Sequence, residues 1–359
     1  MLHNNTDMKI LNSSPISSFG GLNLVLDRFN KIGIGNFLND QLPSLPTQTR
    51  YSWKDIFYSF WSVLFCGGDC AEDLAGNFRN SLLDNPFMQI PSPDRVLGRM
   101  KDLAEPKQTC IAKRGHLLHE FGLNSLLVRL NLDLIKRLKL LNSSGLTLDY
   151  DNTAIFTHKS DAKKNYKNNY CYYPGVGTIG DVVVYVENKN GDSDAQTLQE
   201  KTLERMFQAL DQANIKTTNF RADGASYQMK TLLVAAKNTE NIYIRARKDP
   251  AVMKAIATIT NWEEKKLESG VVHFGSTKYI PFSKRAGSHK LTHELKPCRL
   301  VIYKVKNTDG QINMYTGEAC DYYAIVTNDY AQSPEEIVNF YNHRGTSEKE
   351  FDIMKNDFG

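Results

Sequence analysis

Residues 335–357 read EEIVNFYNHRGTSEKEFDIMKND and, after a turn, predict a single helix. At about 100° per residue, Arg344 lies at roughly −60° from Tyr341 along such a helix. Glu348 and Lys355 lie at roughly −20° and −40°. One carboxylate, two permanent cations and a phenol would then share one stripe. A solvated helix face does not need this arrangement. A surface that holds a metal ion and phosphates does, with Glu as metal ligand and Arg, Lys and Tyr as phosphate clamps.

Two upstream segments supply further carboxylates where predicted strands end. Residues 145–153, GLTLDYDNT, alternate apolar and polar side chains and then become polar. Asp149 and Asp151 share one face of this strand, and Asp151 lies at its end. Residues 217–228, TTNFRADGASYQ, predict a short strand that runs into Asp223 and then a turn into a helix. Magnesium-dependent phosphoryl transfer needs hard oxygen ligands that converge from separate elements, and these segments fit that need.

These residues together resemble the DDE transposases of bacterial insertion sequences. More narrowly, they resemble the subgroup whose helix carries the motif Y-x-x-R-x-x-x-E, six residues, then K. Every spacing of this motif is met by Tyr341, Arg344, Glu348 and Lys355. The D-x-T of the family corresponds to residues 151–153 and its R-x-D to residues 221–223. Similar segments in the N-terminal third are GGLNLVLDRFNKIGI, AEDL at 71–74 and PSPDRVLGRM at 91–100, so the resemblance covers most of the chain.

The resemblance also implies the roles of the site residues. It implies that the catalytic triad is Asp151, Asp223 and Glu348. These carboxylates would hold two Mg²⁺ ions about 3.5–4 Å apart, and Mn²⁺ would substitute. One ion would activate water or a DNA 3′-hydroxyl, and the other would stabilise the leaving oxygen. The residues implied to bind phosphates near the cleaved end are Tyr341, Arg344 and Lys355.

The function implied by the resemblance is a DNA transposase that cuts at terminal inverted repeats and joins the ends to target DNA. Its implied partners are double-stranded DNA and a second copy in a homodimer, and its implied location is the cytoplasm, at the nucleoid when bound to DNA. The sequence stops soon after Lys355, where family members usually continue, so the expectation is either a C-terminally truncated copy or a fragment of a longer chain. Two alternatives stay open: a DNA-binding remnant that is catalytically incomplete, and a ribonuclease H-like nuclease with another duty.

The positive charge expected of a DNA-binding protein is concentrated in one segment of the chain. The chain has 359 residues, 41% of them hydrophobic, and a formal charge of only +4. Residues 241–310 hold fourteen Lys or Arg against six Asp or Glu, which predicts a phosphate-binding surface or, alternatively, a solvated β-rich insert. The six cysteines show no zinc-binding spacing. The longest apolar stretch, Ile56–Cys66, is too short to span a bilayer, and no membrane partner is expected.

The order of predicted elements gives an α/β fold: a ribonuclease H-like catalytic core with a β-rich insertion, preceded by an all-helical N-terminal domain. In particular, we expect one helix from about 107 to 141 and a strand at 312–317. The predicted domains are a flexible lead-in at 1–20, a helical DNA-binding and dimerisation domain at 21–143, the core at 144–250 with 328–359, and a basic insertion at 251–327.

Three individual assignments are left open. Asp149 competes with Asp151 for the first catalytic position; the D-x-T match favours Asp151, and Asp149 would then support the site or be a solvated carboxylate. The segment 158–173, HKSDAKKNYKNNYCYY, interleaves Lys with Tyr; it would either track a DNA strand by charge and stacking or form an exposed loop. Trp262 would either stack on a displaced base or pack in the ordinary way.

Overall fold

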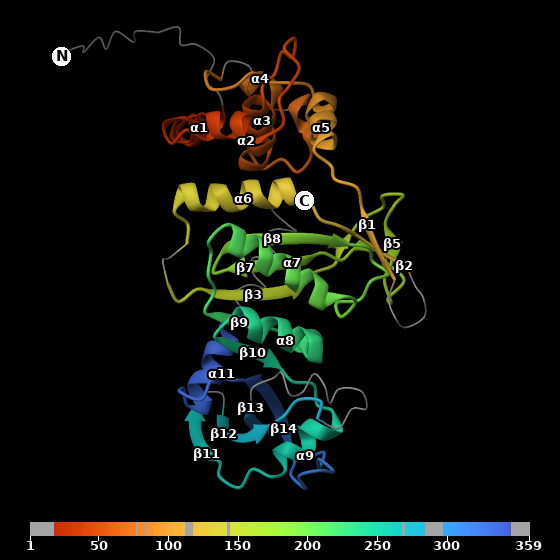
Figure 1. Ribbon diagram of the computed structural model, residues 1–359, viewed down its shortest axis with the longest axis vertical. Helices are drawn as coiled ribbons and strands as arrows, with labels where there is room; N and C mark the ends of the chain where they lie inside the picture. The colour runs from red at the N-terminus through yellow and green to blue at the C-terminus, as the bar shows by residue number, and fades with distance from the viewer. Residues whose placement is uncertain are drawn as a thin grey trace, which may run out of the picture. The chain divides into compact units, whose positions relative to one another are not determined.

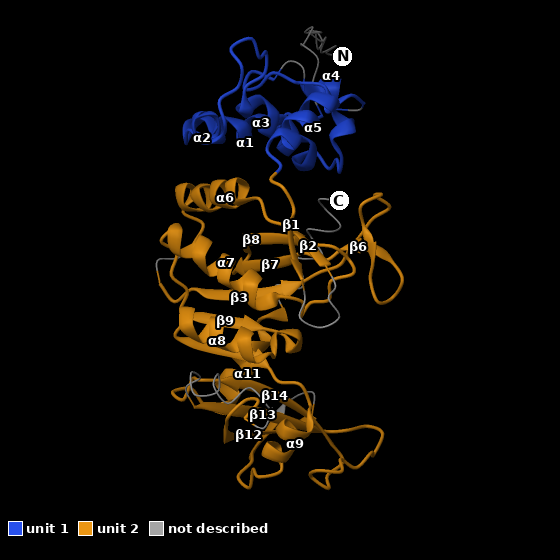
Figure 2. Cartoon of the chain, turned by 45° about the vertical axis from the view of Figure 1, so that its right-hand side comes forward, with its two compact units in different colours: residues 1–104, 354–359 blue, residues 105–353 orange. Residues whose placement is uncertain are grey.

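A computed structural model describes residues 18–76, 78–82, 85–111, 118–141, 144–267, 270–283 and 297–345. The described residues fall into two compact units, one on each side of the Ala104–Glu105 bond (Figure 2). Glu348 and Lys355 lie outside the described residues. Among the described helices, none is both long enough and apolar enough to cross a membrane.

The first unit is built from short helices. They are α1 (Leu22–Lys31), α2 (Ile34–Gln41), α3 (Trp53–Phe65), η1 (Ala71–Leu74), α4 (Arg79–Leu82) and α5 (Pro93–Asp102). Helix α3 starts with a capping box, in which Ser52 and Asp55 satisfy each other's backbone N–H groups. Helix α5 starts at Ser92 with a proline in its first turn, as the sequence predicts. The role of this unit in DNA binding stays a prediction.

The prediction of one helix at 107–141 is wrong. The chain instead forms β1 (Gln108–Ile111), β2 (Leu118–Gly122) and α6 (Ser125–Leu138). Strands β1 and β2 pair with each other, and β2 also pairs with β8 of the main sheet. The Asn124 side chain accepts a hydrogen bond from the backbone N–H of Leu127 at 2.9 Å, which starts α6 only after the hairpin. Pairing with a distant strand thus overrides the local helical pattern.

The second unit is organised around one eleven-stranded sheet, whose order is β1-β2-β8-β7-β3-β9-β10-β14-β13-β12-β11 (Figure 1). Its central strands are β3 (Thr147–Asn152), β7 (Gly175–Ile179), β8 (Val182–Lys189), β9 (Asn219–Ala222) and β10 (Asn241–Arg245). Strands β3, β9 and β10 are parallel, whereas β7 and β8 are antiparallel to their neighbours. The large mixed sheet with helices confirms the predicted α/β class.

Helices cover both faces of this sheet. They are α7 (Gln199–Gln212), α8 (Met229–Asn238), α9 (Pro250–Ile256) and α11 (Pro334–Asn342). Figure 1 shows α7 and α8 beside each other along the central strands. Alternation along β10 separates two cores, because Ile242 and Ile244 pack with the residues of α7, α8 and α9. Tyr243 points to the other face, where it packs with Ile337 and Val338 of α11.

The β-rich segment extends the same sheet. Its strands are β11 (Glu263–Leu267), β12 (Gly270–Tyr279), β13 (Cys298–Lys306) and β14 (Cys320–Thr327), and β14 pairs antiparallel with β10. The prediction of a strand at 312–317 is wrong, because residues 314–316 form a turn and residues 312, 313 and 317 have no regular secondary structure. Gly317 has a φ of 70° and donates its N–H to the Asn313 carbonyl at 2.8 Å, which reverses the chain before β14.

A second, three-stranded sheet lies in the connection between β3 and β7. Its order is β4 (Ile155–Phe156), β6 (Tyr170–Tyr172) and β5 (Lys163–Lys164). It packs closely on Gly191 in the turn after β8, where an added Cβ would lie 2.3 Å from the Lys163 carbonyl oxygen and 2.7 Å from that of Cys171. Only glycine leaves room for this approach, so the turn fixes where the small sheet sits.

Candidate active site

The two described aspartates of the predicted triad lie at the carboxyl ends of adjacent parallel strands, Asp151 in the last two residues of β3 and Asp223 directly after β9. Tyr150 on β3 is the register partner of Ala222 on β9. Asp151 and Asp223 are the next residues along their chains, so the register brings them together across strands that lie about 4.8 Å apart. The carboxyl ends of parallel strands are where α/β proteins commonly place their ligands.

Asp223 caps the short helix η2 (Gly224–Ser226), because its Oδ1 accepts a hydrogen bond from the Ala225 N–H at 2.9 Å. Burial, and then the neighbouring Asp151 carboxylate, raise the pKa of Asp223 above its ordinary value. The Arg344 guanidinium and backbone N–H groups oppose this shift in pKa and do not overcome it. The two carboxylates therefore share one partly desolvated space, in which negative charge is poorly neutralised.

Arg344 reaches the same space from the end of α11. Its Nη1 donates to Asp151 Oδ2 at 2.9 Å, and the two side chains are 11% and 22% exposed. Burial lowers the pKa of Arg344, but the Asp151 and Asp223 carboxylates and the Tyr341 phenol outweigh it, so the net pKa is raised and the guanidinium stays charged. The structure therefore brings together Asp151, Asp223 and Arg344, three of the predicted site residues.

The helix that precedes Arg344 is shorter than predicted. Helix α11 ends at Asn342, and residues 343 and 344 form a turn. The His343 N–H still bonds to the Asn339 carbonyl, four residues back, whereas the Arg344 N–H bonds to the Tyr341 carbonyl, three residues back. The expectation of one continuous helix is therefore wrong at this point, because the last turn tightens before Gly345.

Tyr341 is buried between α11 and the sheet. It is 8% exposed, and its hydroxyl donates to the Ala222 carbonyl at 3.2 Å, one residue before Asp223. Burial raises the pKa of Tyr341 and outweighs the lowering by Arg344, so the phenol stays protonated and able to donate. This hydrogen bond fixes the end of α11 to the strand that leads into Asp223.

A buried ion pair ties together the strands that carry the aspartates. Asp149 and Arg221 are register partners on β3 and β9, and two hydrogen bonds of 2.7 and 2.6 Å join them. A third hydrogen bond runs from Arg221 Nη1 to the Phe340 carbonyl at 2.5 Å. Asp149 is 4% exposed, which rules out the solvated alternative. This role of Arg221 was not predicted from the sequence, because it depends on the register between β3 and β9.

The family model described as transposase DDE domain group 1 matches residues 11–359. The chain belongs to this family of DDE transposases. No curated protein matches the chain.

Several solved structures are similar to this transposase at low identity. The piggyBac transposase synaptic complex with hairpin DNA has 10% identity and a TM-score of 0.38, over 92% of this chain and 67% of that one. The Drosophila P element transposase strand transfer complex has 9% identity and a TM-score of 0.27, over 65% and 49%. The Mos1 mariner paired end complex with Mn has 14% identity and a TM-score of 0.21, over 61% and 65%. The transposase thus spans about half to two thirds of the length of these chains.

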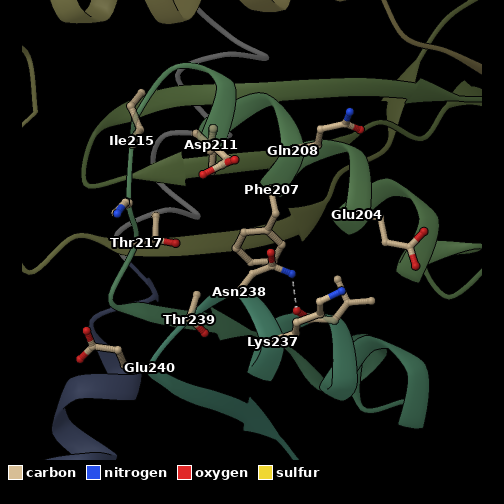
Figure 3. Close-up of a pocket in the computed structure, with 13 residues that line it drawn as sticks. Glu204, Phe207, Gln208, Asp211, Ile215, Thr217, Lys237, Asn238, Thr239 and Glu240 are labelled. Atoms are coloured by element: carbon tan, nitrogen blue, oxygen red, sulfur yellow. Dashed lines mark hydrogen bonds between the residues drawn. The ribbon is translucent and has the colours of Figure 1, made fainter.

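One cavity of the transposase lies away from the aspartates. It has a volume of about 690 Å³ and is lined by α7, α8 and the segments that precede β9 and β10 (Figure 3). Thr217 and Glu240 precede the amino ends of β9 and β10, whereas Asp151 and Asp223 lie at the carboxyl ends of β3 and β9. In Figure 3, Glu204 and Asp211 on α7 and Lys237 on α8 are part of the lining. This cavity is not part of the candidate active site.

Several cations of the basic segment 241–310 form ion pairs or hydrogen bonds within the protein. Lys304 binds Glu318 at 2.6 Å, Lys265 pairs with Glu335, and Arg299 donates to the Gln332 carbonyl at 2.8 Å. Trp262 packs in the ordinary way, because its indole N–H donates to the Ile259 carbonyl at 3.2 Å and Lys304 lies 4.2 Å over its ring. Fewer cations of this segment are therefore available to bind DNA phosphates than its formal charge suggests.

Proposed function

We propose that this transposase cuts DNA at the ends of its element and joins those ends to target DNA, with Asp151 and Asp223 as catalytic, metal-binding carboxylates. The observation that carries the proposal is their meeting at the ends of adjacent parallel strands, with the Arg344 cation 2.9 Å from Asp151. Glu348, which comes four residues after Arg344, would supply the third carboxylate.

The strand order supports a ribonuclease H-like core. The five strands β8-β7-β3-β9-β10 form a mixed sheet, in which three antiparallel strands are followed by two that are parallel to the third. Counted along the chain, the first strand of this core is β3, which carries Asp151, and the fourth is β9, which leads into Asp223. Helices α7 and α8 pack on one face of the sheet. The side chains of the site lie at the carboxyl ends of its parallel strands.

The donor set fits Mg²⁺ or Mn²⁺, which prefer hard carboxylate oxygens. Burial and then the Asp151 carboxylate raise the pKa of Asp223, and a divalent cation between the two carboxylates would offset both effects. Divalent ions held there, and by Glu348, would supply Lewis acidity for the attacking water or 3′-hydroxyl and for the leaving oxygen.

The described residues position the reaction in three ways. The Asp149–Arg221 pair fixes the two strand ends relative to each other. The hydrogen bond from the Tyr341 hydroxyl to the Ala222 carbonyl holds α11 beside Asp223. This hydrogen bond would have to break before the hydroxyl could contact a DNA phosphate. Arg344 would exchange Asp151 for a DNA phosphate once that carboxylate is neutralised, and Lys355 would contact a neighbouring phosphate.

A cleavage assay tests the proposal directly. Purified protein is incubated with the element's own flanking DNA and Mg²⁺ or Mn²⁺, and a chelated sample serves as the control. We expect metal-dependent nicks confined to the element's ends. Metal-dependent cuts without preference for the ends would indicate a general nuclease, and end binding without nicks would indicate a catalytically incomplete remnant.

Light scattering with and without DNA tests the proposed homodimer in the same samples.

Replacing Arg344 by alanine should weaken binding to cleaved-end DNA and flatten its dependence on salt. Loss of one phosphate contact reduces the slope of log K against log salt by roughly 0.9. Binding is measured by anisotropy over a range of salt concentrations, with Lys237→Ala as the matched control, because Lys237 is an exposed cation beside the remote cavity. An unchanged slope for Arg344→Ala would remove the phosphate contact from the proposal.

A further inference from the structure

A cavity of about 450 Å³ lies between the small three-stranded sheet and the turn that follows β8. One wall is the loop between β5 and β6, with Lys164, Asn165 and Tyr166, together with Tyr173. The other wall is the turn between β8 and α7, residues 191–196. Figures 1 and 2 show the small sheet at the end of the large sheet toward which the arrow of β3 points.

Backbone contacts place this cavity beside Asp151. The N–H of Thr153, two residues beyond Asp151, donates to the Pro174 carbonyl at 3.2 Å, and Pro174 directly follows Tyr173. Burial raises the pKa of the Tyr173 phenol, and the carboxylates of Asp151 and Asp223 raise it further. The phenol therefore lies within electrostatic reach of both aspartates.

The walls of the cavity are fixed by contacts on both sides. The Tyr173 N–H donates to the Lys189 carbonyl at 2.7 Å. The Ser193 hydroxyl lies 2.9 Å from Nδ1 of the buried His119, which anchors the turn from the far side. Lys163 binds Asp192 at 3.1 Å and joins the small sheet to the same turn. The cavity is thus built before any ligand arrives, which lowers the entropy lost on binding.

The lining favours an aromatic, uncharged ligand. Tyr166 is 88% exposed, so most of its side chain is open to a partner. Asp192 and Asp194 also line the cavity; Lys163 neutralises Asp192, and the carboxylate of Asp194 would repel a phosphate that entered. A nucleobase carries no charge and stacks on aromatic rings. Its amino groups can donate hydrogen bonds to carboxylates. Lys167, which is exposed near the Tyr166 ring, can meet the phosphates outside.

We propose that this cavity binds one unstacked nucleobase of the DNA strand that lies at Asp151 and Asp223. Tyr166 and Tyr173 provide the stacking surface, and Lys164 and Lys167 hold the adjoining phosphates. The inference rests on the proposed function for the presence of DNA at the aspartates, but it concerns a separate binding event. Base stacking on an aromatic side chain contributes about 1–3 kcal/mol, which corresponds to an affinity change of roughly 5- to 150-fold.

The test uses three fluorescent DNA probes in the absence of divalent metal, so that cleavage does not occur. The first is a duplex with a single-stranded tail, the second has the same tail with abasic sugars, and the third is blunt. We expect the full-length protein to bind the first probe about tenfold more tightly than the second. Equal affinity for the first two probes would overturn the proposal, because the abasic tail keeps every phosphate.

Variants separate stacking from general effects. Tyr166→Leu and Tyr173→Leu should each reduce the preference for the tail with bases and leave affinity for the blunt duplex unchanged, whereas Tyr173→Phe should keep the preference. Tyr330→Leu, at a tyrosine that is 52% exposed elsewhere, is the control. Tyr166 is too exposed for its replacement to unfold the protein, so a preference that survives in Tyr166→Leu and Tyr173→Leu would also refute the assignment. Base-dependent binding without metal-dependent cleavage would reject the proposed function and leave this inference standing.

Discussion

Replacing Asp223 by asparagine should lower metal-dependent DNA cleavage by at least about a thousandfold, because one carboxylate of the proposed metal site is lost. The asparagine side chain can still accept the hydrogen bond from the Ala225 N–H, which Asp223 accepts at 2.9 Å. Local geometry and binding to end DNA should therefore be retained. Cleavage rates under saturating protein and binding by anisotropy measure the two effects separately.

The same substitution should stabilise the metal-free protein at neutral pH. Because the pKa of Asp223 is raised in the folded state, its contribution to stability is fully present below the ordinary aspartate pKa of about 3.9 and is lost as pH rises through the raised value. Asp223→Asn removes the destabilising charge, so its melting temperature should exceed that of the wild type at pH 7. The difference should shrink in acid.

Asp181→Asn provides the control, because Asp181 is an exposed carboxylate in the turn between β7 and β8. It should change neither cleavage nor melting temperature. Adding Mg²⁺ should raise the melting temperature of the wild type and of Asp181→Asn more than that of Asp223→Asn. Wild-type cleavage by Asp223→Asn would show that the metal site has been assigned to the wrong carboxylate.

Breaking the buried Asp149–Arg221 ion pair should lower the free energy of unfolding more than any of the other substitutions. Arg221→Met leaves the Asp149 carboxylate, which is 4% exposed, without its cation, and it also removes the hydrogen bond to the Phe340 carbonyl. A buried charge left in this way costs about 3–5 kcal/mol of unfolding free energy. Urea unfolding followed by circular dichroism gives the value.

A double-mutant cycle identifies the origin of this loss. Asp149→Asn combined with Arg221→Met should be less destabilised than the sum of the two single variants, because no charge is then buried alone. The matched exposed pair is Lys201 and Glu204, whose side chains are 50% and 49% exposed and whose coupling should stay below about 1 kcal/mol. Additive effects at Asp149 and Arg221 would contradict the role assigned to this ion pair.

The sequence predicted those features that depend on local pattern. Alternation followed by a polar break placed Asp151 at the end of β3, and a turn glycine after Asp223 marked the end of β9. The α/β order of the core followed from the alternation of apolar segments and turns. The two aspartates could be grouped because the carboxyl ends of parallel strands meet at one edge of a sheet.

Other features depend on partners far away in the chain and escaped prediction. The hairpin of β1 and β2 forms because β8 offers an edge for pairing, although residues 107–122 read locally as helix. The Asp149–Arg221 pair depends on the register between β3 and β9, which no local pattern specifies. The end of α11 at Asn342 depends on hydrogen bonding in its last turn rather than on the spacing of its charged residues.

The contacts that complete the site also set when it can form during synthesis. Arg221 bonds to a carbonyl 119 residues further along the chain, and Asp151 meets Arg344 193 residues further on. At about 5–20 residues per second, a ribosome needs on the order of ten seconds or more to make the latter stretch. Nascent chains that end before α11 contain both aspartates but lack the groups that fix and neutralise them. Interrupted translation therefore yields chains in which both aspartates are present but the site around them is not assembled.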